Sequence, residues 1–273
     1  MSLSMVTIVS ASGEAVELPV GSSLGYQLEE VEGLDPVKAT IASSNFGLTD
    51  GASYQSSRRD VRNIVMRIGL IPDFVTNTVQ SLRLGLARKM MPKSQVTLRF
   101  HDEDGTVLRA VGRVESFEAP LFVQSPKATI SFLCMDPDFI SEVESSFSGS
   151  SVADLTNTTL NYEGTVNTGF RLEMVVNRPT NEISFVVQTS EGETKRMDFA
   201  MALASGDKIE ISSVFGGKGV WVTKGGVRET ALYATTPNSH FLTLSSGPNA
   251  VRVQLAGAAI PYTIKHYARH GGL

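Results

Sequence analysis

FLTLSSGPNAVRVQL, residues Phe241 to Leu255, is the stretch that decides the fold class of this chain. Its centre, Gly247-Pro248-Asn249, is typical of a tight turn, because proline fixes φ near the turn value while glycine and asparagine tolerate left-handed angles. After the turn, Val251, Val253 and Leu255 alternate with polar residues, which is the period of a half-buried strand. The stretch therefore predicts two short strands joined by a turn, the last hairpin of a β domain.

Composition sets the broad class. The chain has 273 residues, 41% of them hydrophobic, so it can bury a large core and fits best as two domains. Its net charge of −4 and the absence of a basic stripe disfavour nucleic-acid binding. The single cysteine, Cys134, lies in an apolar alternating run, which predicts a buried free thiol. No run of about 18 apolar residues and no cationic leader occur, so neither membrane spanning nor export is expected.

Alternation with period two dominates the first half, and one helix interrupts it. The clearest strand runs through Ile64, Met66, Ile68 and Leu70, whose side chains should share one buried face. The helix is predicted over residues 73–91, from an N-cap at Asp73 to a stop before Pro92. Its last turn carries Arg88 and Lys89, which suit the negative end of the helix dipole. Apolar residues at spacings of four and three form one stripe that should cover a sheet: Val75, Val79, Leu82, Leu86 and Met90.

A serine-rich stretch without periodicity follows Glu144 and reads ESSFSGSSVADLTNTT. Such composition is typical of an interdomain connection, so the predicted domains are residues 1–145 and 146–273. Beyond it, many short alternating runs separated by turn residues predict a sandwich or jelly roll. The expected fold class is mainly β: an N-terminal β-sandwich with one α-helix and a C-terminal β-sandwich or jelly roll.

Two glycine motifs invite an enzymatic interpretation and fail on context. Gly21-Ser22-Ser23-Leu24-Gly25 has the spacing of a hydrolase nucleophile elbow, but too little chain precedes it and Gly33 to Pro36 interrupts any helix after it. Gly216-Gly217-Lys218-Gly219 lacks the leading glycine and the hydroxyl residue of a phosphate-binding loop. Two turns flanking the strand Val220 to Thr223 explain this second stretch.

Titratable residues give no defensible site either. Of the four histidines, His101, His240, His266 and His270, only the last two have a metal-ligand spacing, and an exposed tail is the favoured interpretation of that pair. Asp136, Asp138 and Glu142 directly follow a strand and have no sugar-stacking aromatic cluster around them in sequence. No catalytic, metal-binding or cofactor-binding residue is assigned, no cofactor is predicted, and the chain is not expected to be an enzyme.

The only tryptophan, Trp221, raises the question of carbohydrate binding. Galectins stack a sugar on one tryptophan, but here Val222, Thr223 and Lys224 follow where that family has glycine and glutamate. A core or edge position is therefore favoured over a sugar platform.

A combination of segments, in order, resembles the distal tail proteins of long-tailed phages. The first half holds a long strand, a helix, hairpin strands and then Phe132-Leu133-Cys134-Met135-Asp136-Pro137-Asp138-Phe139, which is similar to the close of the first domain in that family. The second half continues with Asn161-Tyr162-Glu163-Gly164, then Ser205-Gly206-Asp207, then the Gly247-Pro248-Asn249 hairpin. Each piece is weak alone, and the order across nearly the whole chain carries the resemblance.

The resemblance implies a structural virion protein of the tail tip or baseplate, made in the host cytoplasm. Its first domain would close a homohexameric ring between the tail tube protein and the tail-tip or receptor-binding proteins, while the second domain, a galectin-like β-sandwich, would project outward. DNA would only pass through the channel, past acidic residues such as Asp102, Glu103 and Asp104, and no membrane would be bound. The alternatives are a carbohydrate-binding module or two-domain β-sandwich hydrolase, and another tail-tube or baseplate subunit.

Overall fold

The computed structural model describes residues 2–22, 24–45, 47, 50–121 and 123–273. The chain forms two compact units, Met1–Glu142 with His270–Leu273, and Val143–Arg269. This division differs from the predicted one at residue 145, because the predicted connection begins inside a strand, β10 (Phe139–Ser150), which runs from one unit into the next. Serines hid this strand in the sequence, since most of its second half is exposed and needs no apolar alternation. The last four residues return to the first unit, which the sequence did not indicate.

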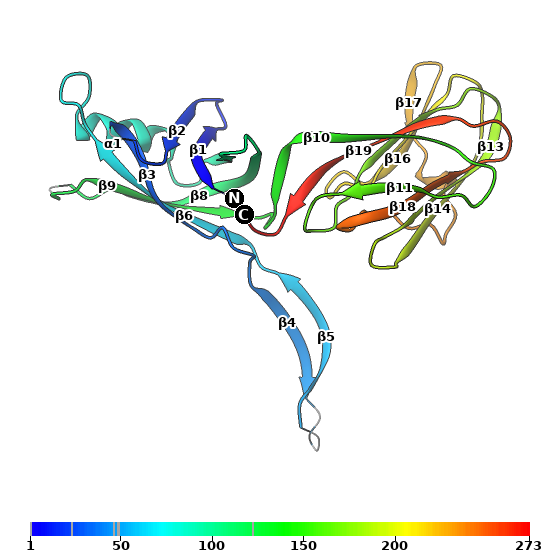
Figure 1. The fold of residues 1–273 in the computed structure, drawn as a ribbon, viewed down its shortest axis with the longest axis horizontal. Coiled ribbons are helices and arrows are strands. Elements are labelled where there is room, and N and C mark those ends of the chain that lie inside the picture. The colour runs from blue at the N-terminus through cyan, green and yellow to red at the C-terminus, as the bar shows by residue number, and fades with distance from the viewer. Residues whose placement is uncertain (1, 23, 46, 48–49, 122) are drawn as a thin grey trace. The chain divides into compact units, whose positions relative to one another are not determined.

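The first unit is an antiparallel sheet that folds over on itself (Figure 1). One run of neighbours is β2-β1-β7-β8 and a second is β8-β9-β6-β3. The long strand β8 belongs to both runs, and its register shifts between Val114 and Ser116, where such a bulge bends a strand. The strands are β1 (Leu3–Ser10), β2 (Ala15–Pro19), β3 (Gly25–Glu32), β6 (Arg62–Ile71), β7 (Gln95–Asp102), β8 (Val107–Glu118) and β9 (Lys127–Cys134).

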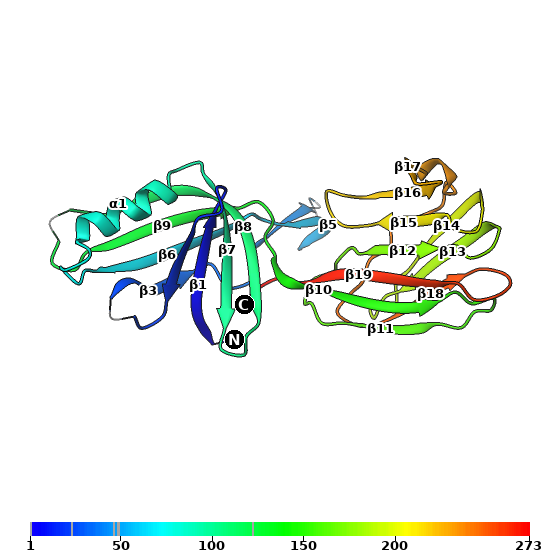
Figure 2. The ribbon, with the colours of Figure 1, turned by 90° about the horizontal axis from the view of Figure 1, so that it is seen from above.

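Alternate side chains of these strands fill the core of the first unit, as the period-two pattern predicts. On β6, Ile64, Met66 and Ile68 are fully buried, and the core residues of β7 and β9 are Val96, Leu98, Phe100, Ile130 and Phe132. Helix α1 (Val79–Lys89) contacts β6 and lies beside β6 and β9 in Figure 2. With 11 residues, α1 is too short to cross a bilayer, and no other described helix is long and apolar enough to do so.

The helix begins six residues later than predicted. Asp73 caps a separate turn, in which its carboxylate accepts the backbone N–H of Val75, Thr76 and Asn77. The N-cap of α1 is Thr78, whose hydroxyl accepts the N–H of Ser81 at 3.2 Å while the Ser81 hydroxyl accepts that of Thr78. Asp73 and Thr78 are both good caps, and the sequence pattern selected the wrong one.

The predicted apolar stripe is therefore confirmed from Val79 onward and wrong at Val75. Leu82, Leu86 and Met90 are buried, and Val79 packs against the same core. Val75 precedes the helix and is 90% exposed.

The second unit is a sandwich of two antiparallel sheets. One sheet has the order β11-β18-β13-β14, and the other has the order β17-β16-β15-β12-β19, followed by this unit's part of β10 (Figure 2). Its strands are β11 (Thr158–Tyr162), β12 (Arg171–Val175), β13 (Thr180–Gln188), β14 (Thr194–Leu203), β15 (Lys208–Ser212), β16 (Gly219–Lys224), β17 (Val227–Thr230), β18 (Gly247–Gln254) and β19 (Pro261–His270). Buried apolar side chains of both sheets form one core between them. The mainly β fold class, with one helix in the first unit, is confirmed.

The stretch Phe241 to Leu255 forms one strand where two were predicted. Gly247, Pro248 and Asn249 lie inside β18, opposite β11, and the bend comes before them. The Asn249 side chain causes this shift, because it is fully buried and donates to the carbonyl oxygens of Ser245 at 2.8 Å and Gly247 at 2.9 Å. The alternation after it is as predicted, with Val251, Val253 and Leu255 all buried.

Candidate functional site

The most exposed element of the first unit is a hairpin that the sequence analysis missed. Strands β4 (Ala39–Asn45) and β5 (Ala52–Arg59) pair only with each other among the described residues and extend away from the remaining strands of the unit (Figure 1). All but one of their fifteen residues are exposed, including Ile41 and Tyr54 at 63% and 64%. A two-stranded hairpin is marginally stable alone in water, and its free edges can pair with another chain. These features mark an assembly surface.

The root of the hairpin is held rigidly by charged groups. Arg59 forms a bidentate pair with Asp138, whose side chain is only 2% exposed. The Thr40 hydroxyl is 3.0 Å from both carboxylate oxygens of Asp60. The hairpin is therefore anchored at its base, while its length is left free for a partner.

Arg62 lies just beyond the root and joins four segments of the first unit. Its Nε donates to the carbonyl oxygen of Pro137 at 2.6 Å, and its two Nη atoms donate to those of Gly33, Asp35 and Gly271 at 2.5 to 2.8 Å. The guanidinium also stacks over the ring of Phe139, 4.2 Å from its centroid. Burial lowers the pKa of this guanidinium, and the nearby Cys134, Asp138 and Asp35 act in the opposite direction.

A second exposed feature is the turn before α1. Phe74 has a φ of 59°, in the left-handed region that is uncommon for a bulky residue, and its side chain is 79% exposed. The Asp73 carboxylate holds this turn, and its hydrogen bonds with Thr76 and Asn77 lower the pKa of Asp73 to about 2. A fixed turn that exposes an aromatic ring beside Val75 is typical of a contact site.

The residues weighed as catalytic or metal ligands have structural partners or lie apart. His266 and His270 are on one strand, β19, where residues four apart are roughly 13 Å apart, and His266 is only 6% exposed, so the predicted exposed tail is wrong. Asp138 pairs with Arg59, and Glu142 accepts a hydrogen bond from Arg99 at 2.6 Å. No group of three His, Cys, Asp or Glu residues in the described ranges could hold a metal ion.

The glycine motifs and the cysteine also have simple places in the fold. Ser23 lies outside the described residues, and Gly25 opens a strand where a hydrolase elbow requires a helix. A turn in which the Gly217 N–H donates to the Val214 carbonyl precedes β16, and a second turn follows it, as predicted. Cys134 is a buried free thiol, also as predicted, and burial raises its pKa to about 11.

The acidic hairpin tip and Trp221 were the other residues weighed for a function. The Asp102 carboxylate accepts the backbone N–H of Ser2 at 2.8 Å, whereas the side chains of Glu103 and Asp104 are exposed. Trp221 lies on the outward face of the second unit, half-buried, so it is not a core residue.

Comparison with known proteins identifies the second unit. Residues 163–270 match the family model described as the siphovirus-type tail component, C-terminal domain. The match covers most of the second unit, which is therefore similar to this tail-component domain. The resemblance to phage distal tail proteins is thereby confirmed.

Solved structures extend the likeness to the whole chain. The crystal structure of the Dit protein of phage SPP1 is 14% identical, with a TM-score of 0.69 over 97% of this chain and 98% of that one, so both units have the distal tail fold. Chains from the phage p2 baseplate in its activated conformation are 9% identical, with TM-scores of 0.47 with strontium and 0.48 with calcium. They cover 96% and 97% of this chain and 97% and 98% of theirs. A comparison with curated proteins finds no match.

Proposed function

We propose that this chain forms a closed ring of six copies that joins the tail tube to the tail-tip or receptor-binding proteins of the virion. The observation that carries the proposal is the exposed β4–β5 hairpin, an element whose free edges need a partner. In a cyclic assembly each copy offers one surface and receives another, so a hairpin docked on the next copy would close the ring. The SPP1 protein of the same fold is described as a paradigm of the hub adsorption apparatus in phages that infect Gram-positive bacteria.

The remaining parts of the proposal follow from the ring. The tail tube protein would meet one face and the tip proteins the other, and the Phe74 turn is a candidate for one of these contacts. DNA would pass through the channel without being held, since an acidic or neutral wall does not retain phosphates by counterion release. Exposed Glu103 and Asp104 are candidates for that wall. The chain would be made in the host cytoplasm, would act in the virion and would catalyse no reaction.

Mass measurement tests the ring. Each copy is 29.4 kDa, so light scattering should give about 176 kDa for six copies, alone or with tail tube protein added. In a shortened variant, an Asn-Gly turn joins Thr40 to Arg58 and replaces residues 41–57, which keeps the Thr40 and Arg58 pair at the root. We expect this variant to melt like the full chain and to remain monomeric.

Two outcomes would contradict the proposal. A full chain that stays monomeric at high concentration, even with tail tube protein present, would favour a carbohydrate-binding module or another tail subunit. A shortened variant that still forms rings would remove the hairpin from the interface. As a matched control, Ile41→Ser with Tyr54→Ser keeps the hairpin backbone and removes its two large apolar side chains. Rings from this control would show that strand pairing is sufficient.

A further inference from the structure

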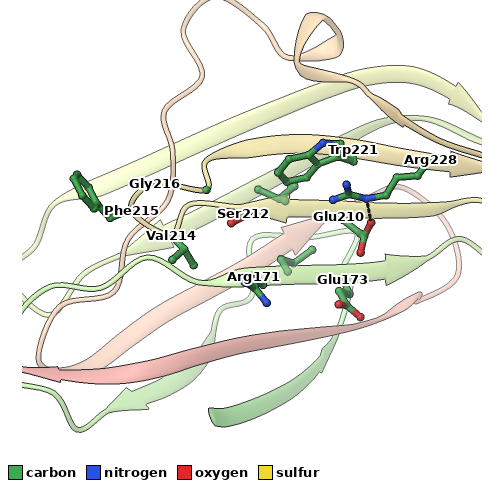
Figure 3. Close-up of a pocket in the computed structure, with 12 residues that line it drawn as sticks. Arg171, Glu173, Glu210, Ser212, Val214, Phe215, Gly216, Trp221 and Arg228 are labelled. Carbon is green, nitrogen blue, oxygen red and sulfur yellow. Dashed lines mark hydrogen bonds and ion pairs between the residues drawn. The ribbon is translucent and has the colours of Figure 1, made fainter. Parts of the chain in front are cut away.

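The sheet of the second unit that contains β12, β15 and β16 has one face on the core and one face in solvent. The solvent face has a hollow of about 460 Å³ over these three strands. Figure 3 shows its residues as an elongated arrangement, with Trp221 and Arg228 at one end and Phe215 at the other. Arg171 and Glu173 lie along the side formed by β12. An open hollow with aromatic and charged lining on a rigid sheet is a ligand-site candidate.

Trp221 forms a fixed aromatic wall of the hollow. A Cβ atom at Gly219 would lie 2.5 Å from the Cη2 atom of Trp221, so the indole ring lies against this glycine. The Arg228 guanidinium stacks on the ring, 4.3 Å from its centroid. The stacked pair restricts the ring to one orientation, which lowers the entropy that a ligand would otherwise have to remove.

Two carboxylates in the hollow are held as ready acceptors. Glu210 accepts from Arg228 Nε at 2.7 Å and from Lys208 at 3.1 Å, and Lys208 also lies 3.3 Å from Glu173. The hydrogen bond from Arg228 is the main reason that the pKa of Glu210 lies below its usual value, so the group stays ionised at neutral pH. Fixed, ionised oxygens accept strongly from ligand hydroxyl groups.

Arg171 is the positively charged residue of the hollow that is available to a ligand. Its side chain is exposed, and within the described part of the chain its guanidinium has no hydrogen-bond or ion-pair partner. The lining holds two arginines, Arg171 and Arg228, and two glutamates, Glu173 and Glu210. Lys208 and Lys265 lie beside the hollow, where they pair with these glutamates, and add an excess of two positive charges. The excess favours a ligand that carries an anionic group.

At the other end of the hollow, Phe215 is 84% exposed on the loop between β15 and β16. Gly216, with a φ of 75°, and the Gly217 to Val214 hydrogen bond hold this loop in a turn. The hollow therefore offers apolar surface at both ends and polar groups between them.

We propose that this hollow binds an acidic saccharide. A sugar ring combines an apolar C–H face, for Trp221 or Phe215, with hydroxyl groups that donate to Glu173 and Glu210, and its anionic group would pair with Arg171. A purely apolar ligand would leave these charges unpaired, and a small inorganic anion would use neither aromatic side chain and would meet the carboxylates. The proposal does not depend on the ring, because every residue lies within one unit.

Trp221 is the only tryptophan, so its fluorescence in the full chain reports directly on the hollow. The probes are tetragalacturonate, the same oligosaccharide as its neutral methyl ester, and glucose 1-phosphate, each titrated to about 5 mM, in the range of weak binding. We expect saturable fluorescence changes with an acidic probe and binding at least tenfold weaker with the methyl ester. A response to tetragalacturonate alone would identify a carboxylate ligand, and one to glucose 1-phosphate alone would identify a phosphate.

Matched variants complete the test. Arg171→Gln should weaken binding of the acidic probe by about tenfold, the loss of one charge-assisted hydrogen bond. Arg196→Gln, at an exposed position on the opposite sheet, should bind like the parent chain. Saturable heat of binding that persists in Trp221→Ala, or binding unaffected by Arg171→Gln, would overturn the proposal. The proposal would also be overturned if neither acidic probe changed the fluorescence. This result would be independent of the mass measurement, which tests only the ring.

Discussion

Arg62 shows how one buried cation can organise a β domain. Its side chain is fully buried, and the four carbonyl oxygens that it satisfies come from three places along the chain: Gly33 and Asp35, Pro137, and Gly271. Position 33 accepts only glycine, since its φ is 87° and a Cβ atom would lie 2.0 Å from the Asn63 carbonyl oxygen. Removing the cation would leave several buried acceptors without donors, which is among the more costly changes in a core.

We expect Arg62→Met to lower the free energy of unfolding of the full chain by about 3 to 5 kcal/mol, because it breaks a buried charged network from one side. Urea unfolding measures this change. The control is Arg67→Met on the same strand, where the arginine pairs with Glu30 and Glu32 at the surface and should contribute less than about 1 kcal/mol. Equal losses for the two variants would mean that Arg62 is not the organising residue.

His266 gives the second unit a dependence on pH. Burial lowers the pKa of this imidazole, while Glu144 and Glu163 act weakly in the opposite direction. The unfolded chain then binds the proton more readily than the folded one, so the stability is complete above about pH 6.5 and falls as the pH drops below it. Urea unfolding at pH 7.5 and 5.0 should show the loss, and His266→Gln should reduce it. His240→Gln, at an exposed position, should leave the pH dependence unchanged. An unaltered dependence in His266→Gln would assign it to other groups.

At the scale of elements, α1 covers its sheet with fewer residues than its sequence pattern suggests. The Tyr26 hydroxyl donates to the Leu82 carbonyl at 2.9 Å and fixes the helix from the sheet side. Leu82 and Leu86 provide the buried face.

Substitutions before and after the start of α1 test which residues of the predicted apolar stripe are buried. Leu82→Asp should destabilise the chain by about 3 kcal/mol or more, since an unpaired charge would replace a side chain that is 8% exposed. Val75→Asp should change the melting temperature little, because Val75 is 90% exposed. Thermal unfolding by circular dichroism measures both. A large loss for Val75→Asp would place that residue on a buried face after all.

Sequence patterns succeeded for strands such as β6, where one face is buried and apolar residues alternate clearly. Ile64, Met66 and Ile68 were assigned to the core from alternation alone, because period two leaves no choice of face. The hairpin β4–β5 was missed because both its faces are exposed, so no alternation marks its strands. The position of the turn before β18 depends on the buried Asn249 side chain, and the sequence does not reveal that burial.

For the candidate sites, too, the sequence revealed local motifs but not contacts that depend on the fold. The lack of a catalytic or metal motif could be predicted, but the hollow beside Trp221 could not. It brings together Arg171, Glu210 and Trp221 from three strands through cross-strand register. That register is a tertiary property, and spacing along the chain does not contain it.

At the scale of the whole molecule, the two units differ in how the chain completes them. The second unit is one continuous segment, Val143–Arg269, whereas the first needs Met1–Glu142 and His270–Leu273. The fragment 143–269 should therefore fold alone with a single cooperative transition.

The fragment 1–142 lacks both the Gly271 acceptor of Arg62 and the Leu273 N–H that donates to the Leu34 carbonyl at 3.0 Å. It should unfold at lower urea than the first unit of the full chain, as followed by circular dichroism. A fragment 1–142 as stable as the intact unit would show that the last four residues contribute little.

The return of His270–Leu273 to the first unit also sets an order for biosynthesis. Most domains at the start of a chain can fold while the ribosome is still making the rest. Here Arg62 is translated early, but its acceptor at Gly271 emerges only after the whole second unit has been synthesised. The first unit thus reaches its final stability after translation passes residue 271, so nascent or prematurely terminated chains would be poor partners for assembly.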